Sequence, residues 1–325
     1  MQTVSTFQRF RDWVEQRYIA LILTSLALGL LLPRFFATFE GLTSFILMVN
    51  MFTLALGCTP REFLNVLKSP FQILAIVLFI YGFLPLLAFG LGSLLFPNHP
   101  EITAGLVLIA VLPVAMTSAF WTDLAKGNLP LTLSIITLTT FLAGLVTPGV
   151  MGVMAGQLVE FDAQALVVKL IKTVIIPCII GLLFRQKFPA TTKKAKPYLD
   201  LGVRLNVFLI LAINGAVMRP YLSDVGPRVF VIIFAVFAYV LLSYLTGFGF
   251  ASLLFPKDLG SRISVSFVSG MRNNGAGIVI ALAYFPPLVA MPVILSILLQ
   301  QPMASIVKRL VDYRAGQVQP VKESY

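Results

Sequence analysis

The sequence predicts an all-α polytopic membrane protein with about ten transmembrane helices. Of its 325 residues, 58% are hydrophobic and only 11% are charged, and the mean hydropathy is +0.94. Runs of about 20 apolar residues recur along the chain, and each is long enough to cross a hydrocarbon core about 30 Å thick. The expected spans are residues 18–33, 41–57, 71–96, 102–121, 129–157, 164–184, 200–217, 228–255, 262–285 and 287–307.

Positive charge is distributed unevenly between the two sides of these spans. The net charge is +11, and 17 of the 24 Lys and Arg residues fall on one side if the N-terminus is cytoplasmic. Only Arg34, Arg219 and Arg228 fall on the other side. Since cytoplasmic loops carry the excess of Lys and Arg, we expect a plasma (inner) membrane protein with both termini cytoplasmic and an even number of helices. The basic residues therefore indicate membrane topology and not nucleic-acid binding.

The sequence offers little for catalysis. Cys58 and Cys178 are the only cysteines and His99 is the only histidine, so the usual ligands for a zinc or iron centre are too few. The chain also lacks a Gly-x-Ser-x-Gly elbow, a P-loop and a dinucleotide-binding fingerprint. We therefore expect no enzyme activity, no cofactor and no ATP-driven pumping.

Two short segments of the sequence resemble each other. Residues 86–97 (LLAFGLGSLLFP) and 245–256 (LTGFGFASLLFP) are identical at 8 of 12 aligned positions. They end the third and eighth spans, so two related halves would cross the membrane in opposite directions, as in many secondary transporters. We therefore predict a five-helix repeat over 1–157 and an inverted copy over 158–325. Chance similarity between apolar segments is the alternative.

The fourth and ninth spans each contain an interruption near mid-membrane. Pro113 removes a backbone donor in the fourth, and Gly270 loosens the ninth beside a run of polar residues. Interruptions at corresponding positions of two halves indicate a binding site, because irregular backbone at this depth must be buried in protein or line a cavity. Each alone is also typical of a simple bend in a packed helix. The predicted crossing residues are Pro113, Met116, Ala119, Gly270, Met271 and Gly275.

These segments resemble the motifs of the bile acid:sodium symporter family. Residues 113–128 (PVAMTSAFWTDLAKGN) are similar to the family's PGGTxSNxxTxLAxGD segment, and residues 270–277 (GMRNNGAG) to its GMQNSGLA segment. The resemblance extends over most of the chain and implies two crossed discontinuous helices. It also implies a core domain of helices 3–5 and 8–10 and a panel domain of helices 1, 2, 6 and 7. Substrate would bind in the cleft between the two domains, beside the crossing.

The chain departs from the family where the resemblance places sodium ligands. The resemblance retains Ser118 and Thr132, but the other ligand positions hold apolar residues or arginine, namely Ile80, Ala119, Ile136, Val268 and Arg272. Among the carboxylates, only Asp123, near the inner end of the fourth span, approaches the membrane. We therefore expect no metal site and weak or absent sodium coupling. If sodium is bound, Ser118, Thr132 and Ser269 remain to hold it.

Arg272 lies at the centre of the ninth span, where a charged side chain costs roughly 2.5–3.5 kcal/mol even on lenient scales. Two functional roles are open, and we favour the first. As a fixed cation in the vacated sodium site, its guanidinium would donate to backbone carbonyls that hold the crossed helices together. Pointing into the cleft, it would pair with a substrate carboxylate or sulfonate. An arginine that snorkels to the surface is the structural alternative.

Either role of Arg272 favours an anionic substrate, because two helix N-termini with unpaired N–H groups would converge at the interruptions. The candidate substrate-binding residues are Arg272, Asn273, Asn274, Thr117, Ser118 and Asn214, although such amides and hydroxyls are also typical helix caps and bridges. We expect alternating-access transport of small organic anions (carboxylates) by a chain in the lipid bilayer that can act as a monomer. Sodium symport with remodelled ligands and a ligand sensor that does not transport are the alternatives.

Overall fold

The computed structural model describes residues 6–57, 70–156, 158–159 and 163–314, and this part of the chain contains helices and no β-strand. Helices occur at all ten predicted ranges, and two short ones, α1 (Thr6–Gln16) and α3 (Pro33–Ala37), flank the first. In the first half these are α2 (Tyr18–Leu31), α4 (Thr43–Ala55), α6 (Pro70–Leu78), α7 (Leu84–Leu95), α8 (Pro100–Val111), α9 (Thr117–Leu124) and α10 (Leu129–Met154). In the second half they are α11 (Ala163–Leu170), α12 (Ile176–Lys187), α13 (Pro189–Val225), α14 (Arg228–Leu254), α15 (Leu259–Gly270), α16 (Asn274–Tyr284) and α17 (Ala290–Arg314).

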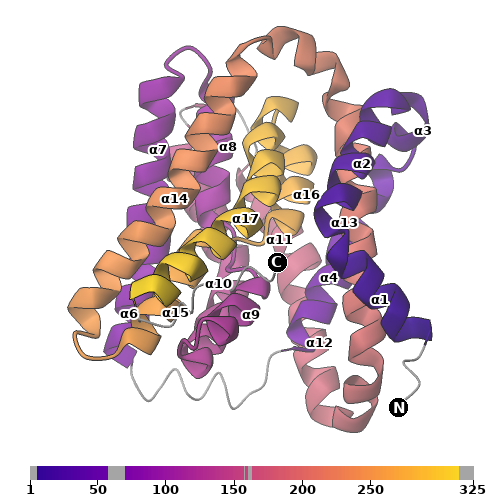
Figure 1. Cartoon of the computed structure of the whole chain (residues 1–325). Helices are drawn as coiled ribbons and strands as arrows, with labels where there is room; N and C mark the ends of the chain where they lie inside the picture. Colours follow the sequence, from indigo (N-terminus) through magenta and orange to yellow (C-terminus); the bar gives the residue numbers. More distant parts are fainter. Residues whose placement is uncertain (1–5, 58–69, 157, 160–162, 315–325) are drawn as a thin grey trace, which may run out of the picture.

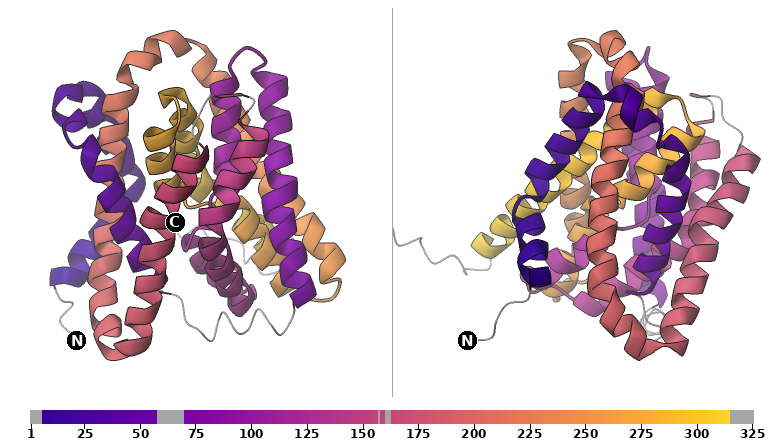
Figure 2. Two further views of the ribbon diagram at one scale, coloured as in Figure 1. Left: turned by 180° about the vertical axis from the view of Figure 1, so that it is seen from behind. Right: turned by 90° about the vertical axis from the view of Figure 1, so that its right-hand side faces the viewer.

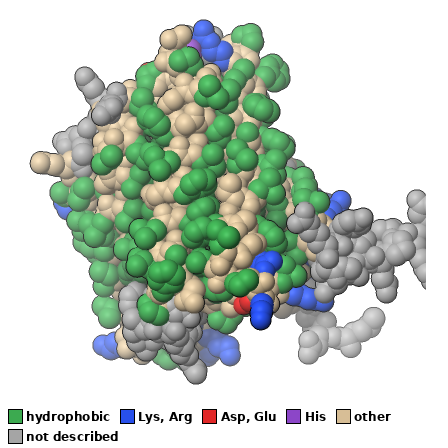
Figure 3. Space-filling view, turned by 90° about the vertical axis from the view of Figure 1, so that its left-hand side faces the viewer, with side chains coloured by type: hydrophobic (Ala, Val, Ile, Leu, Met, Phe, Trp, Pro, Cys, Tyr) green, Lys and Arg blue, Asp and Glu red, His purple; other side chains and the backbone are tan. Residues whose placement is uncertain are grey.

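The described surface suits a lipid bilayer. Among the described residues, five helical stretches are long and apolar enough to cross a membrane, namely Pro70–Leu95, Leu129–Met154, Pro189–Val217, Arg228–Leu254 and Pro287–Val311. Figure 3 shows one face covered by hydrophobic side chains, with Lys and Arg side chains near its upper and lower ends. Leu253 of α14 and Leu94 of α7 are 80% and 77% exposed, which is favourable only against an apolar solvent. The chain is a multi-pass membrane protein.

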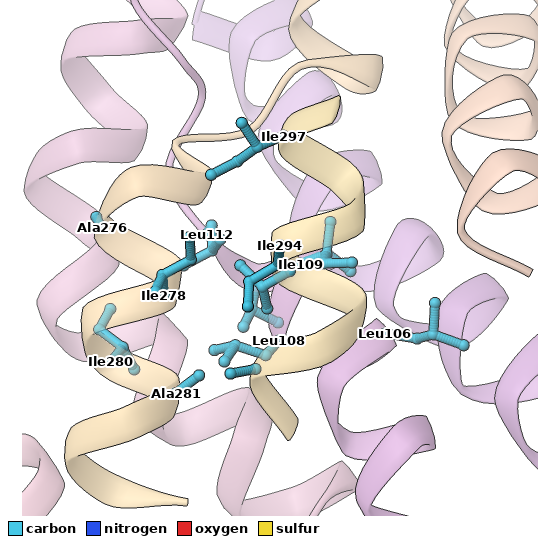
Figure 4. Close-up of a cluster of buried hydrophobic side chains, with 14 of the residues drawn as sticks. Leu106, Leu108, Ile109, Leu112, Ala276, Ile278, Ile280, Ala281, Ile294 and Ile297 are labelled. Carbon is cyan, nitrogen blue, oxygen red and sulfur yellow. The ribbon is translucent and has the colours of Figure 1, made fainter. Parts of the chain in front are cut away.

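The helices form two groups that meet at the centre of the molecule (Figure 1 and Figure 2). We call α2–α4 with α11–α13 the small bundle, and α6–α10 with α14–α17 the large bundle. In the small bundle, a Cβ atom added to Gly29 of α2 would lie 2.0 Å from the Ala212 carbonyl oxygen of α13. In the large bundle, Leu108 and Ile109 of α8 pack against Ile294 of α17 (Figure 4). Each group therefore has closely packed helices of its own.

The two similar sequence segments end their helices in the same way. Phe96 after α7 has φ −132° and ψ 55°, and Phe255 after α14 has φ −130° and ψ 64°. Each N–H donates to the carbonyl oxygen four residues earlier at 2.8 Å. This shared geometry agrees with a repeat, but the ten-helix inverted repeat as a whole stays a prediction, and its predicted boundary at residue 157 lies outside the described residues.

Two features of the helices go beyond the predicted spans. The basic stretch 185–196, between the sixth and seventh predicted spans, is helical apart from Phe188, because α12 continues to Lys187 and α13 begins at Pro189. The third and sixth helices each contain a π-helical turn, at Phe79–Phe83 and Ile171–Ile175. A proline lies at the start of the helical segment that follows each turn, and its missing N–H favours the wider hydrogen-bond pattern before it.

Hydrogen bonds tie the starts of α10 and α15 together. Asn128 caps α10 by accepting from the Leu131 N–H at 3.1 Å, and its amide donates to the Ser261 hydroxyl at 3.0 Å. Asp258 caps α15 by accepting from the Ser261 N–H at 3.1 Å and from its hydroxyl at 2.6 Å. The Ser261 donors hold the pKa of the Asp258 carboxyl below its usual value. Two helices of the large bundle are therefore fixed to each other at this end.

We expect Gly29→Ala to lower the stability by about 1–3 kcal/mol, because the added methyl group would meet the backbone of α13. Gly90→Ala in α7 is the matched control, since a Cβ atom there has nothing within 4 Å. Thermal unfolding in detergent would measure both variants. Equal melting temperatures for the two would contradict the close α2–α13 packing.

Candidate functional site

The interruptions of the fourth and ninth spans pair with each other. Val114 and Arg272 form an antiparallel β-bridge. The Ala115 N–H donates to the Met271 carbonyl at 3.1 Å, and the Asn273 N–H donates to the Pro113 carbonyl at 2.9 Å. Backbone groups that no helix satisfies are thereby paired at a depth where the bilayer offers no water.

The remaining predicted crossing residues lie at the ends of the half-helices. Met116 precedes α9, and Ala119 lies in its first turn. Gly270 ends α15 against Tyr244, whose ring would be 2.5 Å from an added Cβ atom. Gly275 lies in the first turn of α16, where an added Cβ atom would be 3.5 Å from Val207 of α13. The start of α16 therefore faces the small bundle.

Neighbouring helices complete the hydrogen bonding of the bridge. Thr139 of α10 accepts from the Val114 N–H at 3.3 Å, and Gln300 of α17 accepts from the Arg272 N–H at 3.2 Å. The Thr147 hydroxyl of α10 donates to the carbonyl of Val111, the last residue of α8, at 2.8 Å. Polar side chains of α10 and α17 thus hold the crossing from two sides.

A cleft of about 350 Å³ lies beside the crossing, between the small and the large bundle. Helices α4 and α13 form one wall, and α17 with the starts of α9 and α16 forms the other. Its polar lining residues are Asn50, Thr53, Thr117, Lys196, Asp200, Arg204, Arg272, Asn273, Asn274, Gln300 and Gln301. The positive ends of two half-helices meet here, and the volume suits a small metabolite.

Four of the six predicted substrate-binding residues line this cleft, namely Thr117, Arg272, Asn273 and Asn274. The structure corrects the placement of Ser118. This residue is fully buried away from the cleft, because its hydroxyl turns back to donate to the Ala115 carbonyl at 2.7 Å. The sixth residue, Asn214, belongs to α13, but its side chain lies outside the described part of the chain.

The guanidinium of Arg272 points into the large bundle. The residue is 2% exposed, and no described residue forms a hydrogen bond with any of its three side-chain nitrogens. Tyr81 and Tyr239 interact with it electrostatically, and neither tyrosine lines the cleft. The Tyr239 hydroxyl is close to the guanidinium but outside hydrogen-bond geometry, so it is also unpaired. The site therefore contains a buried positive charge without a bonded counter-charge in the described chain.

This geometry corrects both contacts expected of Arg272. The guanidinium does not donate to any backbone carbonyl of the described residues. The three side-chain nitrogens are also buried and do not reach the cleft. Arg272 therefore lines the cleft with its other atoms. Arg272 thus places a buried charge beside the crossing, while its backbone forms the bridge.

The residues left for a sodium ion do not fit one. A hard cation requires several oxygen ligands, but the hydroxyl of Thr132 pairs with that of Thr122 at 3.1 Å. The hydroxyl of Ser269 is buried without a partner, where Gly247 of α14 packs against it. Within the described ranges, no group of three or more Asp, Glu, His or Cys residues converges.

Apolar side chains and a cation occupy the other positions where the family resemblance places sodium ligands. Ile80, Ile136 and Val268 are completely buried hydrophobic residues. Arg272 brings a positive charge, and like charges repel strongly in a medium of low dielectric constant. The side chains at these positions therefore do not suit a bound sodium ion.

The sequence-based analysis missed several cleft residues. Thr53 of α4 is 1% exposed, lines the cleft and has an unpaired hydroxyl. Gln301 accepts from the Trp121 indole at 2.8 Å and donates to Thr117 at 3.3 Å. Two consecutive glutamines, Gln300 and Gln301, in an otherwise apolar span are the signal that would have pointed to them.

The α13 wall of the cleft carries both charges and amides. Lys196 and Asp200 form an ion pair at 2.7 Å, and Arg204 follows one turn later on the same face. The Asn206 amide donates to Asn50 of α4 at 3.0 Å, so it links two helices of the small bundle. The small bundle therefore presents a polar wall to the crossing.

Thr139→Val is expected to lower the stability by about 1–3 kcal/mol, because the buried Val114 N–H would lose its acceptor. Thr140→Val is the matched control. It is buried on the same helix, and its hydroxyl donates only to the Ile136 carbonyl one turn back, at 2.7 Å. Thermal or denaturant unfolding would compare them, and a similar loss in both variants would show that Thr139 does not hold the bridge.

A family model and several similar proteins all relate this chain to one family of membrane transporters. The sequence model described as "Sodium Bile acid symporter family" matches residues 44–223. "Uncharacterized protein YbaS" of Bacillus subtilis is 33% identical over 288 residues, which cover 87% of this chain and 92% of the relative. "Uncharacterized sodium-dependent transporter YocS" of the same organism is 30% identical over 287 residues, covering 88% and 87%. "Probable sodium/metabolite cotransporter BASS2, chloroplastic" of Oryza sativa subsp. japonica is 29% identical over 253 residues, covering 76% and 58%. The chain thus belongs to the sodium bile acid symporter family and is a membrane transporter, not an enzyme.

Proposed function

We propose that the chain is a secondary transporter of small organic anions that works by alternating access with weak or no coupling to sodium. The observation that carries this proposal is the buried, unpaired guanidinium of Arg272 beside the crossing. The cleft supports it, because Asp200 is the one acidic residue among the described lining residues, and it is paired with Lys196. A cleft with this balance of charge favours an anion over a cation.

The charge of Arg272 acts on a substrate without contact. At a separation of about 8 Å and an effective dielectric constant of about 20, a unit charge lowers the free energy of an anion by roughly 2 kcal/mol. The N-termini of α9 and α16 each add about 0.3–1 kcal/mol through their dipoles. Thr117 and Asn273 lie at these N-termini and would supply hydrogen bonds. Both N–H groups of the Asn274 amide already donate within the protein, to Ser296 and Gln300. A bound anion would also offset part of the cost of burying the arginine.

A fixed arginine also explains how transport can proceed without sodium. A permanent cation beside the crossing supplies a positive charge in the region where the resemblance places a bound sodium ion. The site is then ready for an anion whether or not sodium is present. In this proposal the substrate moves down its own electrochemical gradient, in exchange for another anion, or together with a proton that it carries itself.

In the proposed transport cycle the large bundle is the core domain and the small bundle is the panel domain. Substrate binds between them, and rocking of one bundle against the other opens the cleft to each side in turn. The 5+5 inverted repeat would make the two open states similar. We place both termini in the cytoplasm because basic residues concentrate on that side of the spans. A monomer suffices for this cycle, since one chain forms both walls of the cleft.

Sodium-coupled symport is the second candidate, because the name of the relative YocS describes a sodium-dependent transporter. In that case Ser118 and Thr132 would exchange their present hydrogen bonds for contacts with the ion, and Ser269 would supply a third oxygen. The charge of Arg272 would oppose this arrangement. The two candidates therefore differ in one measurable property, the response of uptake to sodium.

Uptake into proteoliposomes is expected to be saturable and equal in sodium, potassium and choline at constant ionic strength. Labelled acetate, lactate, succinate and citrate would serve as probes, and unlabelled anion inside the vesicles should accelerate entry. Uptake in sodium alone would refute the uncoupled mechanism and favour the symporter. Binding without any flux would instead indicate a sensor.

Arg272→Gln is expected to raise the KM for the transported anion roughly 10-fold or more, because it removes about 2 kcal/mol of charge attraction. Arg272→Lys keeps the charge and should retain most of the uptake. Arg219→Gln is the control, since Arg219 is exposed and its side chain donates to the Leu30 carbonyl. Unchanged sodium-independent uptake by the Gln variant would show that the charge has no part in anion transport.

A further inference from the structure

We propose that Gln300 of α17 is a substrate-binding residue whose amide nitrogen donates a hydrogen bond to the carboxylate of the transported anion. This inference rests on the proposed function and assigns a specific contact within it. Gln300 lines the cleft and is 7% exposed, so it is a buried polar side chain at the cleft wall.

The orientation of the Gln300 amide is fixed by the bridge. The backbone N–H of Arg272 can only donate, so the atom that it meets at 3.2 Å must be the oxygen of the amide. The Asn274 amide nitrogen donates to the same oxygen at 2.9 Å. Because the amide oxygen faces the bridge, the amide nitrogen is the polar atom of Gln300 that can donate to a ligand in the cleft.

The amide nitrogen of Gln300 is available for a ligand. It makes no hydrogen bond within the described chain, and it is not among the fully buried unpaired atoms. Two donors at the oxygen also polarise the amide, which strengthens its N–H groups as donors. A carboxylate would accept such a bond well, because hydrogen bonds to charged acceptors are the stronger ones.

The surrounding contacts hold this donor rigidly. Asn274 is itself fixed by donating to Ser296, one turn before Gln300 on α17, at 2.8 Å. The Tyr244 hydroxyl donates to the Gln300 carbonyl at 3.2 Å. A side chain that is already ordered by contacts within the protein loses little conformational entropy when the anion binds.

Gln301 provides a matched comparison. It lines the same cleft, but both ends of its amide are already used, by the Trp121 indole and by the Thr117 hydroxyl. A substitution that adds charge to the cleft at this position has a similar long-range effect, but the amide nitrogen that it replaces already donates to a protein group, Thr117. Comparing variants of Gln300 and Gln301 therefore distinguishes loss of a substrate contact from the effect of an added charge in the cleft.

The test replaces each glutamine by its isosteric acid. In Gln300→Glu, one carboxylate oxygen keeps both internal hydrogen bonds, and the other replaces the cleft donor with an anionic acceptor. We expect lactate binding, measured directly by calorimetry on detergent-solubilised protein, to weaken roughly 100-fold or more, because the added charge and the lost hydrogen bond act together. We expect Gln301→Glu, which adds a similar charge but removes no contact with the anion, to weaken it roughly 10-fold. Melting temperatures should change little in either variant.

A second measurement compares the binding of lactate with that of its neutral amide, lactamide. Lactamide carries an amide N–H that can donate to the carboxylate introduced by Gln300→Glu, so this variant should favour lactamide over lactate relative to the unsubstituted protein. Equal losses in both variants, or an unchanged lactate-to-lactamide ratio, would overturn the assignment of Gln300. Lactate binding with the predicted switch but without flux would overturn the transport proposal alone. Absence of binding by the unsubstituted protein to acetate, lactate, succinate and citrate would overturn both.

Discussion

The hydrogen-bonded pairing of Pro113–Ala115 with Met271–Asn273 is the constraint on which the centre of this protein depends. A helix interrupted in hydrocarbon leaves backbone groups that cost several kcal/mol each if they stay unpaired. One interrupted helix would need water or many side chains to satisfy them. Two interrupted helices that cross can satisfy each other. The pairing fixes the ends of four half-helices and brings two helix N-termini to one wall of the cleft.

The same pairing explains the position of the charge. The bridge holds the backbone of Arg272, and its guanidinium lies within the large bundle near Tyr81 and Tyr239. Its own N–H is held by Gln300. One residue therefore links backbone pairing, a buried charge and the cleft wall. The arrangement supports an anion site without requiring direct contact between the arginine and the substrate.

The sequence predicted the helices and both interruptions because hydropathy and the chemistry of Pro113 and Gly270 are local properties. The family resemblance placed Arg272 at the crossing but not the direction of its side chain, which depends on the backbone pairing. Contacts of Thr139 and Gln300 were missed because they depend on the rotation of α10 and α17 about their axes. Both helices are apolar around most of their circumference, so no periodic pattern defines the face that meets the crossing. Ser118 was placed wrongly because its hydroxyl satisfies a carbonyl of its own turn.

An arginine and a sodium ion differ in what they contribute to a transport cycle. A bound ion adds its own gradient to the driving force and leaves after each turn, whereas Arg272 remains in both states of the carrier. In the proposed mechanism the buried charge is therefore compensated only while an anion occupies the cleft. The loaded carrier then differs from the empty one only through the contacts of the bound anion with the helix N-termini and with the amide of Gln300. Such a carrier gains anion selectivity from a permanent charge, but it cannot draw on the sodium gradient to concentrate its substrate.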